Sequence, residues 1–191
     1  MTHGAPALAG FPALQGVHQK VDGFFARVAA RYPDDLACAS GCADCCAPGL
    51  TLTPLEAEAV EAFLGSLDAG ARARVSRSAA SSDGSACAAL DGERRCAIYP
   101  VRPIVCRSHG VVVRIDAGAG TGKRALPLLD ACEKNFVGRD LAGVDGDCVL
   151  DQRTLSTLVA ALHAASGRDA TARRPLRALL EGSASEEGVA R

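Results

Sequence analysis

The sequence has very few aromatic residues. Only 4% of its 191 residues are aromatic, tryptophan is absent and methionine occurs once. Alanine, leucine and valine supply most of the 48% of residues that are hydrophobic. We therefore expect a core of small side chains on packed helices.

An excess of charge and a long apolar run are also missing. The formal net charge is −1 and the sequence pI is about 6.4. The chain as a whole therefore has no electrostatic attraction to nucleic acid or to anionic lipid. No apolar run approaches the roughly 20 residues that cross a bilayer. We expect neither a nucleic acid nor a membrane as partner; the sequence names no protein partner.

Cysteine, in contrast, is abundant, with nine residues in the chain. Seven of them form two groups, which are Cys38, Cys42, Cys45 and Cys46, and then Cys87, Cys96 and Cys106. Short, irregular spacing of this kind indicates thiolates gathered around a soft metal ion. The alternatives are a disulfide framework and unrelated buried thiols.

Disulfides need an oxidising compartment and are typical of small secreted domains. The first twenty residues contain no basic segment followed by a continuous apolar stretch, so they do not resemble a signal peptide. An odd number of cysteines would also leave one thiol over. We therefore expect a cytoplasmic protein with reduced thiols, which favours metal binding.

Three segments show the spacing of helices with one buried face. The first runs from about Gln15 to Arg31 and ends before Pro33. The second begins after Thr53, which forms a capping box with Glu56, and Pro54 is its first residue. Residues 65–68 should break it before a weaker helix through Val75, and residues 76–86 resemble a loop. The third is opened by Asp151 and closes near Gly167.

Two short runs rich in β-formers, residues 110–115 and 124–129, predict a small hairpin. Pro127 cannot donate to a ladder, so the second strand should lie at an edge or be interrupted. The expected fold is mainly α with a small β-hairpin, a compact cysteine-rich metal-binding domain built around irregular loops. We expect a single domain over residues 10–168, followed by a C-terminal helix and frayed tail over 169–191.

Within the first group, Cys38 and Cys42 are four residues apart and Cys42 and Cys45 three apart. These residues would share one face of a helix, or a turn could let their sulfurs converge while backbone N–H groups face them. Cys45 and Cys46 are adjacent, so they must diverge unless the backbone bends. They suit two metals, or one ligand beside a supporting thiol.

The segment CAIYPVRPIVCR places Tyr99, Arg102 and Pro103 between Cys96 and Cys106, with Arg107 next. Together with the C-x3-C-x2-C-C group and Cys132, this pattern resembles the bacterial CxxCxxCC or YkgJ-like family of zinc- or iron-chelating cysteine-cluster proteins. The resemblance covers about half of the chain. It departs from many relatives in the first spacing, C-x3-C instead of C-x2-C.

The resemblance implies a small cytoplasmic domain that binds zinc or iron, with an iron–sulfur cluster as one form. Flagellin lysine methylases carry a similar cysteine region. The metal ligands that it implies are Cys38, Cys42, Cys45, Cys46, Cys87, Cys96, Cys106 and Cys132.

Several residues near this pattern have more than one interpretation. Four thiolates around Zn²⁺ or a cubane cluster leave a net charge of about −2, which Arg102 and Arg107 could offset if they are not simply surface arginines. Tyr99 would orient a cysteine or an arginine, or pack its ring on the helices. His109 is a candidate ligand or a structural histidine. Cys148 lies outside the pattern, as a buried thiol or a spare ligand.

Three functions remain open at this point. The first is a protein that sequesters or carries zinc or iron through clustered thiolates. The second is an iron–sulfur enzyme or redox protein, which requires an open iron position or a substrate pocket. The third is an interaction module with a structural zinc, which would unfold when the metal is removed. No catalytic residue can be named from the sequence.

Overall fold

The structure is a computed structural model that describes residues 8–116, 127–169 and 171–182. Its described part is mainly helical with two small sheets, which confirms the predicted fold class. The chain forms two compact units. Of the described residues, unit 1 comprises 8–16, 40–103, 163–169 and 171–182, and unit 2 comprises 17–39, 104–116 and 127–162. The single domain over residues 10–168 stays a prediction.

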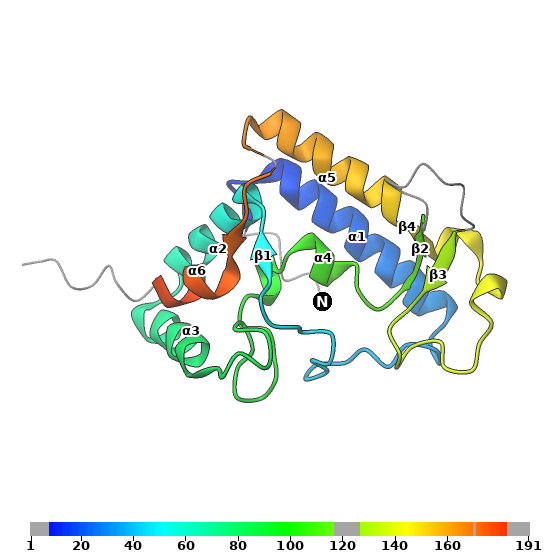
Figure 1. The fold of residues 1–191 in the computed structure, drawn as a ribbon, viewed down its shortest axis with the longest axis horizontal. Coiled ribbons are helices and arrows are strands. Elements are labelled where there is room, and N and C mark those ends of the chain that lie inside the picture. The colour runs from blue at the N-terminus through cyan, green and yellow to red at the C-terminus, as the bar shows by residue number, and fades with distance from the viewer. Residues whose placement is uncertain (1–7, 117–126, 170, 183–191) are drawn as a thin grey trace, which may run out of the picture. The chain divides into compact units, whose positions relative to one another are not determined.

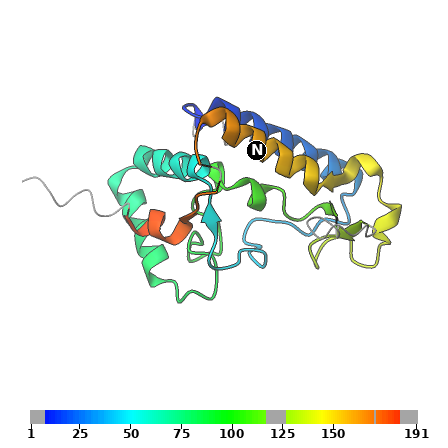
Figure 2. The same ribbon diagram turned by 45° about the horizontal axis from the view of Figure 1, so that its top comes forward.

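Unit 1 is built from α2 (Pro54–Ser66), α3 (Ala69–Ser81) and α6 (Leu176–Gly182), with the short helix η2 (Tyr99–Val101). Figures 1 and 2 show α6 beside α2 and α3, which it contacts. Strand β1 (Thr51–Leu52) pairs antiparallel with β5 (Arg174–Pro175), which leads directly into α6. The apolar core of this unit includes Leu52, Leu55, Val60, Leu64, Ile98, Val101, Leu176 and Leu180.

The capping box of α2 is confirmed. The Glu56 carboxylate accepts hydrogen bonds from the Thr53 backbone N–H at 3.4 Å and from the Thr53 hydroxyl at 2.7 Å, and Pro54 is the first helical residue. The predicted break is shorter than expected, because α2 continues through Ser66.

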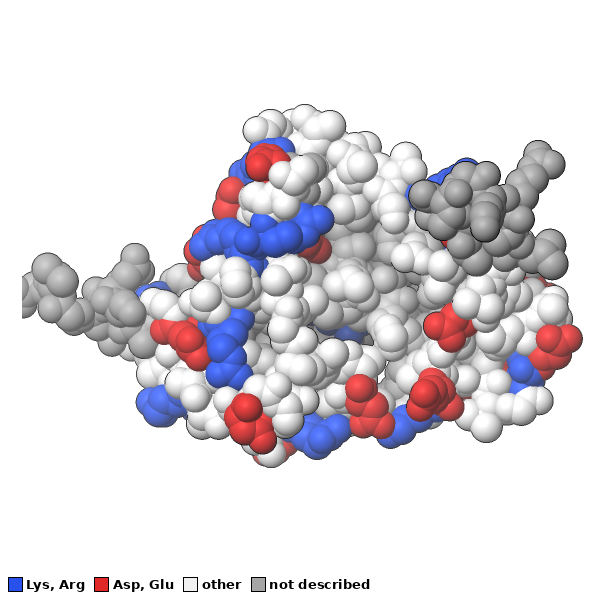
Figure 3. All heavy atoms as spheres, in the orientation of Figure 1, with Lys and Arg blue, Asp and Glu red and all other residues white. Residues whose placement is uncertain are grey.

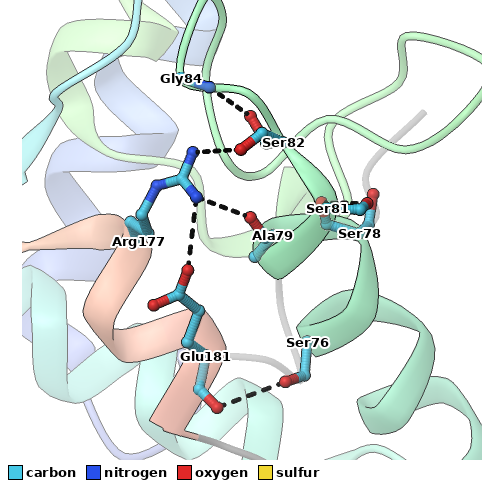
Figure 4. A network of polar contacts seen from close by, with 8 residues as sticks. All are labelled: Ser76, Ser78, Ala79, Ser81, Ser82, Gly84, Arg177 and Glu181. Carbon is cyan, nitrogen blue, oxygen red and sulfur yellow. Dashed lines mark hydrogen bonds and ion pairs between the residues drawn. The ribbon is translucent and has the colours of Figure 1, made fainter.

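The predicted end of the next helix at Val75 is wrong, since α3 runs to Ser81. Asp68 caps its start by accepting from the Ala71 N–H at 2.7 Å. Its far end is held by tertiary contacts (Figure 4): Arg177 of α6 donates to the carbonyl oxygens of Ala79 and Ser82, and the Ser76 hydroxyl donates to the Glu181 carbonyl oxygen. These contacts extend a helix that has little apolar periodicity of its own.

Unit 2 contains most of α1 (Pro12–Arg31) and of α5 (Gln152–Ser166), together with α4 (Ile104–Arg107). Short helices η3 (Leu141–Gly143) and η4 (Gly146–Cys148) precede its last strand. Its three-stranded sheet has the order β3-β2-β4 and is formed by β2 (Val112–Ile115), β3 (Leu128–Asp130) and β4 (Val149–Asp151). The buried cluster of this unit is Val28, Tyr32, Val111, Val112, Phe136, Val144 and Cys148.

The predicted hairpin strands are present in the described residues. β2 and β3 pair antiparallel with Val113 opposite Asp130, and β3 begins after Pro127 at the edge of the sheet. Residues 117–126, including the start of the predicted second strand, lie outside the described part. The parallel pairing of β4 with β2 was not predicted. The first helix starts earlier than predicted, at Pro12, whereas α5 starts and ends as expected.

Charges of both signs are mixed on the face drawn in Figure 3, where acidic side chains border basic ones. The structure also has ion pairs between arginine and glutamate, such as Arg168 with Glu58 and Arg174 with Glu61 in unit 1. Among the helices of the described residues, none is long and apolar enough to span a membrane.

Candidate metal centre

The double-cysteine segment lies in irregular turns in the structure. The Cys46 N–H donates to the Ala43 carbonyl oxygen and the Ala47 N–H to the Cys45 carbonyl oxygen, each at 3.0 Å. The segment is therefore a turn and not a helix. Cys45 is exposed, and Cys42 and Cys46 are partly buried.

The second cysteine segment is tied to the first by the backbone. The Cys87 N–H donates to the Cys46 carbonyl oxygen at 2.9 Å. Leu90 and Cys96 then form an isolated antiparallel bridge around a turn at Asp91, whose carboxylate accepts the N–H groups of Glu93 and Arg95. This turn folds the chain back, so that Cys96 returns toward Cys87.

Cys45, Cys87 and Cys96 lie close enough to Cys46 to affect its ionisation. Partial burial first, and then the charges of these three cysteines, raise the pKa of Cys46 to about 12. Four thiolates gathered without a cation repel one another, whereas a bound cation would stabilise all of them. We call Cys45, Cys46, Cys87 and Cys96 the four-thiol cluster.

Cys38 belongs to unit 2, because the boundary between the units falls after residue 39. Its Sγ accepts a hydrogen bond at 3.2 Å from Nδ2 of Asn135, a residue that sequence reasoning did not identify. Cys132 lies one turn before Asn135, whose N–H donates to the Cys132 carbonyl oxygen at 2.8 Å. Cys106 is a partly buried residue of α4.

Cys148 has a different environment. Its side chain is 1% exposed and belongs to the buried cluster of unit 2. Burial, followed by the charges of Asp147 and Asp145, raises the pKa of this thiol. The buried-thiol interpretation of Cys148 therefore agrees with its position.

The predicted charge-balancing residues also have defined partners. Arg107, 6% exposed, donates from Nη1 to both carboxylate oxygens of Asp22, at 2.7 and 2.8 Å. The Arg102 guanidinium lies 4.6 Å from the centre of the Tyr99 ring, a cation–π contact. Tyr99 itself is 53% exposed, so its ring is not packed in the core. Whether these residues support a metal centre stays a prediction, as does ligation by His109.

The donor chemistry fits a soft metal, since clustered thiols bind zinc, iron or iron–sulfur clusters. In residues 8–116, 127–169 and 171–182, however, no three His, Cys, Asp or Glu side chains are already arranged as ligands of one ion. Binding would therefore require the thiol side chains to turn toward a common point.

Comparison with known proteins adds one decisive finding. Residues 37–135 match the CxxCxxCC family, described as a "Putative zinc- or iron-chelating domain". The chain belongs to this family. The match includes all eight cysteines that the resemblance implied as ligands and excludes Cys148. No curated protein and no solved structure matches the chain. The CxxCxxCC domain identifies the protein as metal-binding, of the zinc- or iron-chelating kind.

Proposed function

We propose that this CxxCxxCC protein chelates zinc or iron through the four-thiol cluster of Cys45, Cys46, Cys87 and Cys96. The observation that carries the proposal is the Cys87 N–H···Cys46 backbone hydrogen bond of 2.9 Å, which joins the two cysteine segments. Burial first, and then the charges of the other three thiols, raise the pKa of Cys46. Four sulfur donors are the number that a closed tetrahedral zinc site or a cubane cluster requires.

In this proposal the backbone brings the two cysteine segments together before the metal binds, and the thiol side chains then turn toward the ion. The Cys87–Cys46 backbone hydrogen bond fixes the distance between the two segments, and the Asp91 turn returns Cys96. The bound metal would supply the positive charge that the thiolates lack. Each thiol that binds releases its proton, so metal affinity should rise with pH.

All nine cysteines are free thiols in the structure. Reduced thiols are typical of the cytoplasm, where glutathione and thioredoxin keep them so. This supports the proposal that the protein works there.

The test compares Cys46→Ser with Cys148→Ala, which removes a cysteine outside both the cluster and the matched segment. Each variant is purified without oxygen, and its zinc, iron and acid-labile sulfide are measured. We expect Cys46→Ser to lose most of the metal, because one of four ligands is gone, and Cys148→Ala to retain it. Equal metal content in both variants would contradict the assignment.

The same measurement distinguishes the metals. Iron and sulfide in near-equal amounts, with a brown colour, would indicate an iron–sulfur cluster. Zinc in a colourless protein would indicate chelation or a structural role.

An iron–sulfur enzyme is the second candidate, on one observation. Cys87 lines a cavity of about 250 Å³ together with Leu50, Pro175 and Leu176. This volume is below the roughly 300–1,000 Å³ of pockets for drug-sized ligands, so a substrate here would be small.

A further inference from the structure

The side-chain amide of Asn135 makes hydrogen bonds through its oxygen and its nitrogen, all of them to residues of unit 2. The residue is 4% exposed. Its Oδ1 accepts the Ala37 N–H at 2.9 Å, while Nδ2 donates to the Gly110 carbonyl oxygen at 2.6 Å and to Cys38 Sγ at 3.2 Å. An amide NH₂ carries two hydrogens, so both donations occur together. The Ala37 N–H can only donate, which fixes the amide oxygen toward it and Nδ2 toward the sulfur.

The backbone around Asn135 is held on both sides. Its own N–H donates to the Cys132 carbonyl oxygen at 2.8 Å, and the N–H of the next residue, Phe136, donates to the Asp35 carbonyl oxygen at 2.7 Å. The Phe136 ring packs edge-on against Tyr32, with centroids 5.6 Å apart. The amide is therefore presented to Cys38 from a fixed position.

Gly110 shapes the other wall around the sulfur. Its φ is +107°, and a Cβ there would lie 3.0 Å from Cys38 Sγ and 3.3 Å from Asn135 Nδ2. Only glycine allows the backbone to approach this closely. The Cys38 residue as a whole is nevertheless exposed. One side of the sulfur is thus held by the protein, while solvent can reach the residue.

We propose that Asn135 is a positioning residue for Cys38, which it presents as a metal-binding thiolate through the Nδ2–H···Sγ hydrogen bond. The inference rests on the proposed chelating function and concerns a thiolate of unit 2 that lies outside the four-thiol cluster. A donated hydrogen bond stabilises negative charge on sulfur and orients the ligand. Hydrogen bonds to cysteine sulfur also tune the electronic properties of bound iron.

The first test uses Co²⁺ as a probe, because its sulfur-to-cobalt charge-transfer band reports on the thiolates. Asn135→Asp keeps the size and the acceptor for Ala37 but cannot donate to sulfur. We expect cobalt affinity to fall about 10- to 100-fold and the band to move to longer wavelength, because the sulfur becomes more electron-rich. In a Cys38→Ser background, Asn135→Asp should shift the band no further.

A second measurement needs no Asn135 variant, which guards against a folding defect. Asn135 is the only asparagine in the 191 residues, so ¹⁵N-asparagine labelling gives a single side-chain amide pair. With ¹¹³Cd bound, we expect one of its protons to couple to the metal through Sγ of Cys38. The coupling should be absent in Cys38→Ser.

The outcomes separate the two proposals. If the wild type binds cobalt and cadmium but neither the band nor the amide proton responds as described, the role of Asn135 is overturned and chelation stands. If the wild type binds none of zinc, iron, cobalt and cadmium, the chelating function is overturned together with the inference.

Discussion

Replacing Gly110 with alanine tests how tightly the Cys38 sulfur is held. Gly138→Ala is the matched control, since Gly138 belongs to the same unit and has a φ of +76° but no atom within 4 Å of an added Cβ. A positive φ costs an L-residue about 1–2 kcal/mol, which both variants share. Only at Gly110 does the new carbon meet Cys38 Sγ at 3.0 Å.

Crowding of a well-packed site costs about 1–3 kcal/mol. We therefore expect Gly110→Ala to lower the free energy of unfolding by about 2–5 kcal/mol in total, against about 1–2 for Gly138→Ala. Urea denaturation followed by far-UV circular dichroism measures both, provided that the slope with urea is unchanged.

A double variant separates crowding from backbone strain. Removing the sulfur with Cys38→Ala should recover most of the excess cost of Gly110→Ala, because the nearest atom is gone. Equal losses in Gly110→Ala and Gly138→Ala, or no recovery in the double variant, would refute the close packing of Gly110 against the thiol.

Two further predictions concern polar contacts away from the thiols. The hydrogen bond from Arg168 is the main cause that lowers the pKa of Glu58. The stabilisation from this pair should be complete above the ordinary pKa of glutamate near 4.5 and should disappear as the pH falls through the lower pKa of the folded state. Glu58→Gln should therefore have a lower free energy of unfolding than wild type at pH 7, and this difference should close in acid. Tyr32→Phe should cost about 1–3 kcal/mol in urea denaturation, because the Asp145 N–H loses the hydroxyl that accepts it at 2.9 Å, and an unchanged midpoint would contradict this.

Local signals in the sequence predicted much of the fold. The capping box of Thr53 and Glu56 needs only four consecutive residues, and Pro127 excludes a central strand by its own chemistry. The end of α3 could not be predicted in this way. Its last turns depend on Arg177, about a hundred residues away in the chain.

The site divides along the same line. The spacing and the family pattern predicted the cysteines as candidate metal ligands, and burial distinguishes Cys148 from the other eight. Asn135 and Gly110 were missed because each acts across the fold: Asn135 is 97 residues from Cys38, and nothing in its local sequence indicates a sulfur partner.

The raised pKa values of two cysteines do not by themselves indicate ligands. Burial is the largest cause for both Cys46 and Cys148. For Cys46 the further causes are the charges of other thiols. As thiolates these groups repel one another, but a cation bound by all of them would stabilise each one. For Cys148 the further causes are two carboxylates, and one of them, Asp145, already pairs with Arg31. The Cys148 thiol is 1% exposed and lies among apolar side chains. A metal ion would lose its hydration there without gaining sulfur donors. The neighbours of a thiol, more than the direction of its pKa, therefore decide whether it can bind metal.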